Sequence, residues 1–307
     1  MVFVPNARHS SNAAAWSTHP SSIVRRPKAR GGRHCALGAV RRCAFGKVGA
    51  VLILLPPSEG KTAVSEGLPI SLSNLHFPAL NDARTEVLAA LRHTSGHPDA
   101  HRILGVGSSL AEDVKRNRRL DVEPSGPAHD VYSGVLYDAL DYPHLTPRQK
   151  EKAREHIVIV SALWGALRFG DPIPAYRLSM SVDLPGTGRL ASFWKRVLDE
   201  PLRAHAGPSL VIDCRSSTYA AAWSPPPGNT VAVNVYQERN GERTVVSHFA
   251  KHTRGELVRH LITRRGRAPE SPAQLLRAAQ ERWTAELEAA RNGRGFQLNV
   301  LLAPPAG

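Results

Sequence analysis

Residues 51–55 read Val-Leu-Ile-Leu-Leu and are followed at once by Pro56 and Pro57. An unbroken apolar run of this length that stops at prolines predicts a buried strand followed by a loop. Residues 157–161 (Ile-Val-Ile-Val-Ser) and 210–213 (Leu-Val-Ile-Asp) have the same character. Longer segments with helical patterns separate these runs along the chain. Buried strands that alternate with helices indicate an α/β fold.

Turn residues, capping signals and hydrophobic periodicity predict the other elements. Helices are expected at residues 82–95, 98–104, 108–120, 147–156, 190–204, 250–264 and 272–290. Strands are expected at 230–236, 244–249 and 296–302, and the first two should form a hairpin through Asn240-Gly241, a pair that favours a type I′ turn. Because a hairpin is antiparallel, residues 51–303 are predicted to form one α/β (α+β) domain, with helices around a mixed sheet.

Composition excludes several classes of protein. The chain has 307 residues and is 42% hydrophobic, which is enough for a sizeable core. Its longest apolar run, at 48–57, is far shorter than the roughly 20 residues of a membrane-spanning helix. Three cysteines cannot form the disulfide framework of a small secreted domain. We therefore expect a cytoplasmic monomer with no membrane contact, no metal and no cofactor.

The net charge of +14 suggests a nucleic-acid partner, but its distribution weakens that inference. Residues 1–50 contain nine basic and no acidic residues, which leaves 31 basic and 26 acidic residues, a net of +5, for the rest. Three interpretations of this segment stay open: a disordered basic arm, an organelle transit peptide, or a translated extension that is not native. The abrupt change of composition at Val51 favours the last, with a native start near that residue.

Residues 103–120 (ILGVGSSLAEDVKRNRRL) fit the pattern of a helix-hairpin-helix element at about 98–120. Glycines in such a turn let the backbone approach a phosphate, and the free N–H groups that begin the second helix would face it. The candidate DNA-binding residues are Gly105, Gly107, Ser108, Lys115, Arg116, Arg118 and Arg119. An ordinary turn between two helices, with a solvated basic face, remains the alternative.

Polar side chains that follow the predicted strands form a second group of candidates, a cleft. Strand ends and the loops after them often carry binding residues. The cleft candidates are Ser58, Lys61, Arg168, Tyr176, Arg177, Asp213, Tyr219, Lys251 and Arg254. Gly60-Lys61-Thr62 matches the end of a nucleotide-binding P-loop, but Leu55 stands where its first glycine belongs, so an ATPase is not expected. Satisfied surface charges and core aromatics remain the alternative for this group.

His248, His252 and Glu256 are spaced four residues apart and would share one helix face, which could seat a metal. Fourteen histidines make such spacing common by chance, so we expect no metal there. Cys214 is the one cysteine in residues 51–303. A thiol that follows a buried strand is more typical of a core residue than of a peroxide sensor.

Several long motifs in order resemble the peroxide-stress protein YaaA family: LILLPPSEGKT (52–62), YSGVLYDAL (132–140), SALWGALRFGDPIPAYRLSM (161–180), FWK (193–195), IDCRSSTY (212–219) and FAKHTRGELVRHLI (249–262). The family residues that carry over are Lys61, Thr62, Tyr132, Gly134, Gly165, Leu167, Arg168, Tyr176, Arg177, Met180, Phe193, Trp194, Tyr219, Ala250, Lys251, Arg254 and Gly255. Family members more often have Ser-Pro-Ala-Lys where this chain has residues 57–61.

The resemblance, which covers about residues 51–299, implies a cytoplasmic protein that protects against hydrogen peroxide by limiting free iron and thus Fenton damage. It also implies non-sequence-specific DNA binding, to duplex or distorted DNA, through a helix-hairpin-helix and a basic cleft. An enzyme acting on a nucleotide or damaged nucleobase, with lyase-like chemistry at Lys61, Arg168, Asp213 and Lys251, is the alternative. A direct iron-binding protein is a third hypothesis.

Overall fold

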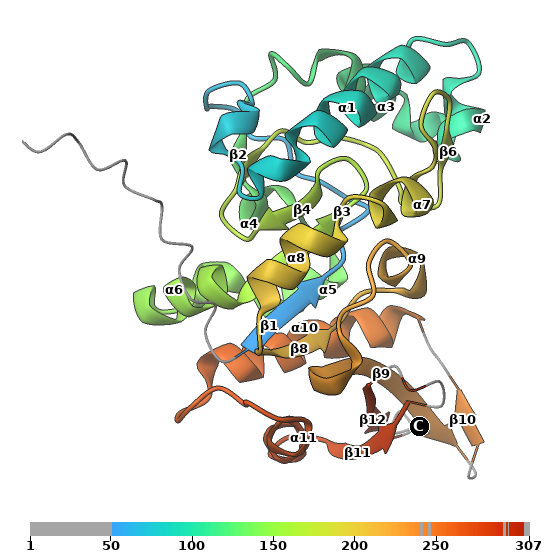
Figure 1. Cartoon of the computed structure of the whole chain (residues 1–307). Coiled ribbons are helices and arrows are strands. Elements are labelled where there is room, and N and C mark those ends of the chain that lie inside the picture. Colours follow the sequence, from blue (N-terminus) through green and yellow to red (C-terminus); the bar gives the residue numbers. More distant parts are fainter. Residues whose placement is uncertain (1–50, 240–241, 245–246, 291–292, 294, 304–307) are drawn as a thin grey trace, which may run out of the picture. The chain divides into compact units, whose positions relative to one another are not determined.

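The computed structural model describes residues 51–239, 242–244, 247–290, 293 and 295–303. The predicted basic extension at 1–50 and the predicted Asn240-Gly241 turn lie outside these residues. The strands of one large mixed sheet run from edge to edge in the order β11 (Thr284–Ala289), β12 (Phe296–Leu302), β9 (Thr230–Arg239), β8 (Leu210–Asp213), β1 (Val51–Leu55), β3 (Ile157–Ser161) and β4 (Gly165–Arg168), and β10 (Glu242–Thr244) pairs with β9. This mixed sheet confirms the predicted fold class (Figure 1).

Strand β1 occupies the middle of the sheet. It pairs in parallel with β3 on one edge and with β8 on the other, so that Ile53 is opposite both Ile157 and Ile212. All five of its residues are buried. Strands β8, β9 and β12 continue the parallel series, whereas β4, β10 and β11 are antiparallel to their neighbours. The three predicted buried strands are therefore confirmed as neighbours at the centre of the sheet.

Helices surround the sheet on both sides (Figure 1). They are α1 (Asn81–Ser95), α2 (Ala100–Leu104), α3 (Ala111–Arg116), α4 (Ala128–Val131), α5 (Val135–Leu140), α6 (Pro147–His156), α7 (Leu190–Lys195), α8 (Asp199–Ala206), α9 (Ser217–Ala220), α10 (Ser247–Thr263) and α11 (Pro272–Gln280). Two small antiparallel pairs, β2 (Gly126–Pro127) with β5 (Pro172–Ile173) and β6 (Asp183–Leu184) with β7 (Gly188–Arg189), lie outside the main sheet.

Local sequence explains where α6 begins. Thr146 accepts a hydrogen bond from the backbone N–H of Gln149, and the Gln149 side chain accepts one from the backbone N–H of Thr146. Pro147 occupies the first turn, where its missing N–H has no intrahelical partner to lose. The helix predicted at 147–156 is confirmed with these bounds.

The structure corrects three predicted elements that follow residue 189. The helix expected at 272–290 ends at Gln280, and β11 follows because residues 284–289 pair one by one with β12. The strand expected at 244–249 ends at Thr244, and α10 already begins at Ser247. The helix expected at 190–204 is divided into α7 and α8. For residues 284–289, pairing with β12 overrides the helical preference of the chain.

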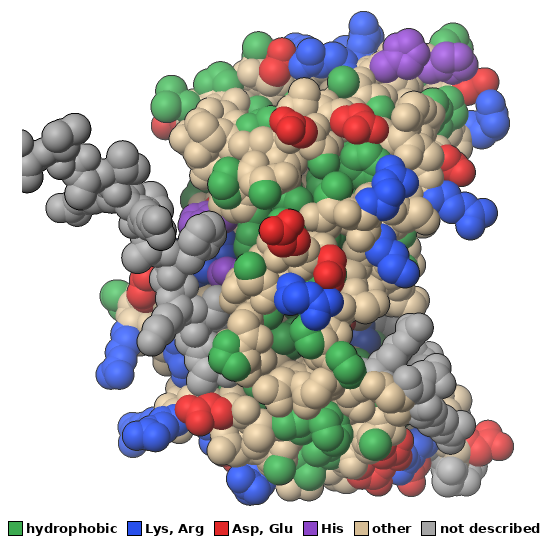
Figure 2. Space-filling view, in the orientation of Figure 1, with side chains coloured by type: hydrophobic (Ala, Val, Ile, Leu, Met, Phe, Trp, Pro, Cys, Tyr) green, Lys and Arg blue, Asp and Glu red, His purple; other side chains and the backbone are tan. Residues whose placement is uncertain are grey.

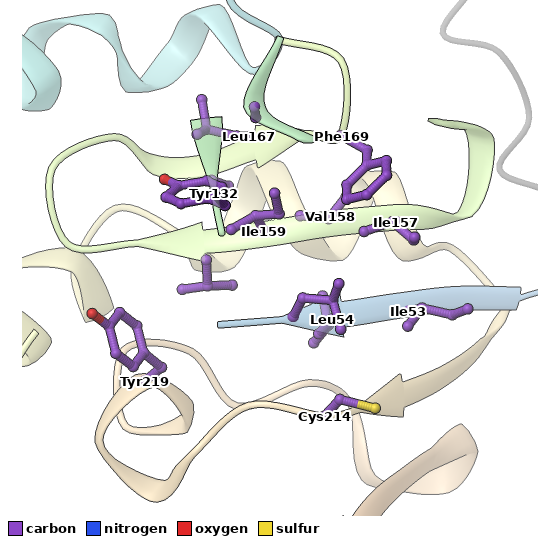
Figure 3. Packing of buried hydrophobic residues seen from close by; sticks show 14 of the residues in the cluster. Ile53, Leu54, Tyr132, Ile157, Val158, Ile159, Leu167, Phe169, Cys214 and Tyr219 are labelled. Atoms are coloured by element: carbon purple, nitrogen blue, oxygen red, sulfur yellow. The ribbon is translucent and has the colours of Figure 1, made fainter. Parts of the chain in front are cut away.

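Buried aromatic and aliphatic side chains fill the space between the sheet and its helices. Figure 3 shows Ile53 and Leu54 of β1 packed beside the residues of β3, with Leu167 and Phe169 beyond them. Trp164, Trp194 and Trp223 are among the largest fully buried side chains, and the Trp194 indole N–H donates to the Ala162 carbonyl at 2.7 Å. The sulfur-bearing side chains of Met180 and Cys214 are also buried, with 1% and 0% exposure.

Among the described residues, no helix is both long enough and apolar enough to span a membrane.

Close packing of α10 against α5 depends on Gly255. A Cβ atom at this position would lie 2.2 Å from the Leu136 carbonyl oxygen and 2.8 Å from the Ala139 Cβ. The Arg259 guanidinium, one turn further along α10, donates to the carbonyls of Leu140 and Asp141 at 2.9 and 2.8 Å. The absence of a side chain at Gly255 therefore fixes how closely the two helices approach.

We expect Gly255→Ala to destabilise the protein, although alanine normally favours a helix over glycine by about 1 kcal/mol. The added methyl group must push α10 away from α5, and overpacking of this kind costs about 1–3 kcal/mol. Urea denaturation followed by circular dichroism measures the change. Gly228→Ala is the matched control, because a Cβ there meets nothing within 4 Å. Equal stability of the Gly255 and Gly228 variants would contradict this account of the helix contact.

Candidate functional site: a crevice at the carboxyl ends of the central strands

A crevice of about 720 Å³ opens where β1 and β8 end. The loop after β1 forms one wall, and the loop after β8 with α9 forms another. The starts of α5 and α10 and the middle of β9 complete it. Its lining residues are Pro56, Pro57, Ser58, Glu59, Gly60, Ser133, Gly134, Val135, Leu136, Tyr137, Asp213, Arg215, Ser216, Ser217, Tyr219, Ala220, Ala232, Val233, Asn234, Ala250, Lys251 and Arg254.

The topology of the sheet explains why the crevice lies there. The chain leaves β1 to form β3 on one side, but it leaves β8 to form β9 on the other side. The loops after β1 and β8 therefore diverge and leave an opening between them. Ligands of open α/β sheets bind at such a switch point, outside the carboxyl ends of the strands.

Two cations on α10 face the crevice. Lys251 and Arg254 are three residues apart, so they share one face of the helix, and both line the crevice. The Arg254 guanidinium donates to the Val233 carbonyl at 2.8 and 3.1 Å, which fixes it against β9. Lys251 is exposed, and no carboxylate of the described residues forms an ion pair with it.

Both carboxylates that line the crevice are already paired. Asp213 accepts two hydrogen bonds from the Arg215 guanidinium, at 2.8 and 2.7 Å, and the guanidinium also donates to the carbonyls of Tyr219 and Trp223. Glu59 forms an ion pair with Arg177 at 3.1 Å. The charges of Lys251 and Arg254 are therefore left in excess, which favours an anionic ligand. Asp213 holds the loop after β8 in place and is not a free general base.

Lys61 lies in a compartment of its own beside the crevice and is not one of the lining residues. Its ammonium donates to the Ser58 carbonyl at 2.9 Å and lies 4.3 Å from the centre of the Tyr176 ring. Tyr132 and Tyr176 share a hydrogen bond of 3.0 Å, and Ser161 contacts the Tyr176 hydroxyl at 2.7 Å. Burial lowers the pKa of Lys61 from 10.5 to about 7, and the nearby charge of Glu59 offsets only part of this effect.

The same burial acts on the tyrosines in the opposite sense. It raises the pKa of Tyr132 and of Tyr176 well above the ordinary value, and it raises the pKa of Tyr219 to about 12. These hydroxyls are therefore neutral at physiological pH and act as hydrogen-bonding groups. Lys61 is the group of this compartment that titrates near neutrality.

The structure brings together most, but not all, of the predicted cleft. Ser58, Asp213, Tyr219, Lys251 and Arg254 line the crevice. Lys61 and Tyr176 lie in the adjoining compartment. Arg177 forms an ion pair with Glu59, which lines the crevice. Arg168 does not join them, because it pairs with Val158 near the amino end of β3. Its guanidinium donates to the carbonyls of Arg154 and Glu155 there.

The predicted helix-hairpin-helix is not confirmed as such. Gly105 ends α2 with a φ of 64°, as a glycine turn requires, but a 3₁₀ turn at Ser108–Leu110 separates Gly107 from α3. Three of the four predicted cations also have acidic partners: Lys115 with Glu112, Arg116 with Asp113 and Arg119 with Glu123. Figure 2 likewise shows Lys and Arg side chains interspersed with Asp and Glu on the visible face.

A smaller hollow of about 350 Å³ connects this turn with the crevice. Gly105, Val106, Arg177 and Asp183 are among its lining residues, and Glu59 lines both the hollow and the crevice. The hollow and the crevice are therefore neighbours that share the side chain of Glu59. Gly107 and Ser108 are exposed beside the hollow.

Ser133, Tyr137 and Asn234 line the crevice but were not among the predicted site residues. Tyr137 donates its hydroxyl to the Pro56 carbonyl at 2.8 Å, and Asn234 donates to Asn299 at 3.1 Å. A signal for Asn234 was present, because Val231, Val233 and Val235 alternate with smaller or polar residues in the predicted strand. That alternation marks the opposite face of the strand as polar.

Within the described part of the chain, no group of three or more His, Cys, Asp and Glu side chains could hold a metal ion. His252 instead contacts Glu256 of its own helix at 3.3 Å.

The fold and the crevice define an α/β protein with a positively charged crevice at the switch point of a mixed sheet. The chain belongs to the family described as "Peroxide stress protein YaaA", which matches residues 51–288. A UPF0246 protein of Streptomyces coelicolor is 42% identical over 259 residues, which cover 82% of this chain and 98% of the relative. A UPF0246 protein of Corynebacterium glutamicum is 42% identical over 215 residues, which cover 69% and 84%.

The lowered pKa of Lys61 predicts a pH-dependent contribution to stability. Between about pH 7 and 10.5 the unfolded chain keeps a proton on Lys61 that the folded chain has lost, so stability gains a positive slope with rising pH. Relative to Lys61→Met, the wild-type protein should therefore become more stable as pH rises from 7 to 9, measured by urea denaturation. Lys195→Met removes an exposed lysine, so its free energy of unfolding should change with pH in parallel with that of the wild type. If the free energy of unfolding of Lys61→Met changes with pH in the same way as that of the wild type, the lowered pKa of Lys61 is contradicted.

Proposed function

We propose that this protein acts in the cytoplasm during peroxide stress, where it limits iron-linked oxidative damage by binding DNA without sequence preference. The observation that carries this proposal is the excess positive charge of the crevice, where Lys251 has no acidic partner in the described chain. Phosphates dominate the affinity of proteins for DNA, and a cation without a partner binds them without losing an ion pair. Membership of the peroxide-stress family supplies the physiological setting.

The glycine turn after α2 supplies a second contact in this proposal. Gly107 has an extended backbone, with φ −73° and ψ 162°, and nothing but the Ser109 hydroxyl lies within 4 Å of a Cβ there. Gly105 and Val106, which precede Gly107, line the hollow that shares Glu59 with the crevice. One duplex could then contact both the turn and Lys251.

We expect Lys251→Ala to weaken binding of the full-length protein to duplex DNA and to reduce the slope of log affinity against log salt by about one. The reason is the loss of one phosphate contact. Fluorescence anisotropy of labelled duplex across a salt series measures both quantities. Lys195→Ala is the control, since it removes an exposed lysine outside the crevice and leaves the basic segment at 1–50 unchanged. Equal effects of the two substitutions would contradict a DNA contact in the crevice.

The contribution of the turn is tested separately with Gly107→Ala. The added methyl group fits the backbone, so it obstructs a phosphate without strain in the fold. Gly105→Ala is a poorer test, because the left-handed conformation of Gly105 would itself destabilise the variant. Unchanged affinity of Gly107→Ala would remove the turn from the proposal and leave the crevice.

A second candidate function, an enzyme acting on damaged nucleotides, rests on the pKa of Lys61. An amine with a pKa of about 7 has a substantial neutral fraction at physiological pH, and the neutral amine is the nucleophile. It could attack the aldehyde carbon of an abasic sugar and, with loss of water, form an imine. The loop at 58–60 would have to open to admit the sugar. The full cluster predicted for this chemistry is not assembled, since Arg168 is remote and Asp213 is paired.

Borohydride trapping tests this candidate, because the reagent reduces an imine to a stable secondary amine. We expect a covalent adduct between the full-length protein and abasic DNA that is lost in Lys61→Met and retained in Lys251→Met. Denaturing electrophoresis and peptide mass spectrometry measure the adduct and its position. An adduct on any other lysine, or none at all, would exclude Lys61 as the nucleophile.

A further inference from the structure

The size of the crevice restricts what can enter it. Its volume of about 720 Å³ lies within the roughly 300–1,000 Å³ of small-molecule sites, and a DNA duplex is far too wide for it. A single nucleotide is of the right size. Phosphate contacts at the rim, which are enough for DNA binding, would leave the interior of the crevice unused.

The interior has the surfaces that a nucleobase needs. Pro56, Pro57, Leu136 and the ring of Tyr137 are apolar, and the Tyr137 ring is held by its hydrogen bond to the Pro56 carbonyl. Rigid apolar walls bury a planar base without ordering further side chains. They cannot by themselves orient the base.

Polar groups on the opposite side could provide that orientation. Asn234 uses its amide N–H for Asn299, which leaves its carbonyl oxygen to accept from a base. The hydroxyls of Ser216 and Ser217 follow β8 and also line the crevice. This combination of apolar walls with a few convergent polar groups is the usual make-up of a small-ligand pocket.

The charges of the lining residues indicate where the phosphate of a bound nucleotide would lie. Glu59 and Asp213 are neutralised by Arg177 and Arg215, so a phosphate that enters meets no unpaired carboxylate from the lining. Lys251 is exposed on α10, and Arg254 lies one turn deeper, held at the Val233 carbonyl. A phosphate beside Lys251 with the base directed toward Tyr137 satisfies both parts of the crevice.

We propose that the crevice binds one nucleotide unit, with its phosphate at Lys251 and Arg254 and its base between the Pro56–Pro57 wall and Asn234. The unit comes either from a free nucleoside monophosphate or from a nucleotide that has been turned out of a DNA strand. The second source rests on the proposed DNA-binding function, whereas the first does not. Extrusion is easiest for a nucleotide that is mismatched or opposite a lesion.

Calorimetric titration of the full-length protein with the four deoxynucleoside monophosphates tests the pocket itself. We expect saturable binding, at least tenfold weaker for the matching nucleosides and for inorganic phosphate alone. Lys251→Ala should weaken binding about tenfold, and Lys195→Ala should not change it. Absence of saturable binding by all four monophosphates would overturn the proposal, and so would equal binding of phosphate alone.

Ser217→Phe and Thr218→Phe form a matched pair for the position of the ligand. Both residues are exposed and adjacent on α9, but only Ser217 lines the crevice. The phenyl group should block nucleotide binding in the first variant and leave it unchanged in the second. Equal behaviour of the two variants, with folding verified by circular dichroism, would place the ligand elsewhere and overturn the proposal.

Duplex DNA carrying 2-aminopurine opposite an abasic site distinguishes the two sources. If the bound nucleotide comes from DNA, the fluorescence of 2-aminopurine should change when the duplex binds to the wild-type protein. It should not change when the duplex binds to Ser217→Phe. Monophosphate binding without this response supports the free nucleotide as the ligand. Anisotropy of an unmodified duplex reports on the proposed function separately. Duplex binding without monophosphate binding overturns this inference alone, and monophosphate binding without duplex binding overturns the proposed function alone.

Discussion

Parallel pairing of β1 on both of its edges is the constraint on which the rest of the structure depends. Strands β3 and β8 pair with both edges of β1, so its backbone groups are satisfied within the sheet. All five of its residues are buried, so its side chains are apolar on both faces. The diverging paths after β1 and β8 then open the crevice at one edge of the sheet. The site is thus a consequence of strand order, and its chemistry comes from the loops and from α10.

Ion pairing decides the electrostatic character of that site. A count of charged lining residues alone, with Glu59, Asp213, Arg215, Lys251 and Arg254, would suggest a nearly neutral crevice. Once Arg177 is paired with Glu59, and Arg215 with Asp213, only the two cations of α10 face a ligand. The Arg215–Asp213 pair has a structural role as well, because its further hydrogen bonds hold the loop that leads into α9. The Arg215–Asp213 pair therefore shapes the crevice, and together with the Arg177–Glu59 pair it leaves the charges of Lys251 and Arg254 in excess.

The central strands, α1 and α6 could be predicted from the sequence because each is encoded locally, by an apolar run, by periodicity or by a capping box. Strand β11 could not, since Ala285 to Ala289 are mainly helix formers and become a strand only by pairing with β12. The site residues likewise divide into those that local sequence predicts and those that depend on tertiary contacts. Ser58, Lys251 and Arg254 could be named from their positions after strands or on a helix, but the pairing of Asp213 with Arg215, the remoteness of Arg168 and the enclosure of Lys61 by Tyr132 and Tyr176 all depend on contacts between distant segments.

The burial of Met180 and Cys214 bears on how this chain endures the oxidant that its family is named for. Peroxide attacks the thiolate, and burial raises the pKa of Cys214 to about 12, so almost no thiolate forms at physiological pH. Met180 is equally closed to solvent, and these two are the sulfur atoms of residues 51–303. The described domain therefore presents no accessible sulfur to peroxide. Oxidation of an accessible cysteine or methionine, a common way for peroxide to disrupt a folded protein, is therefore closed in this domain.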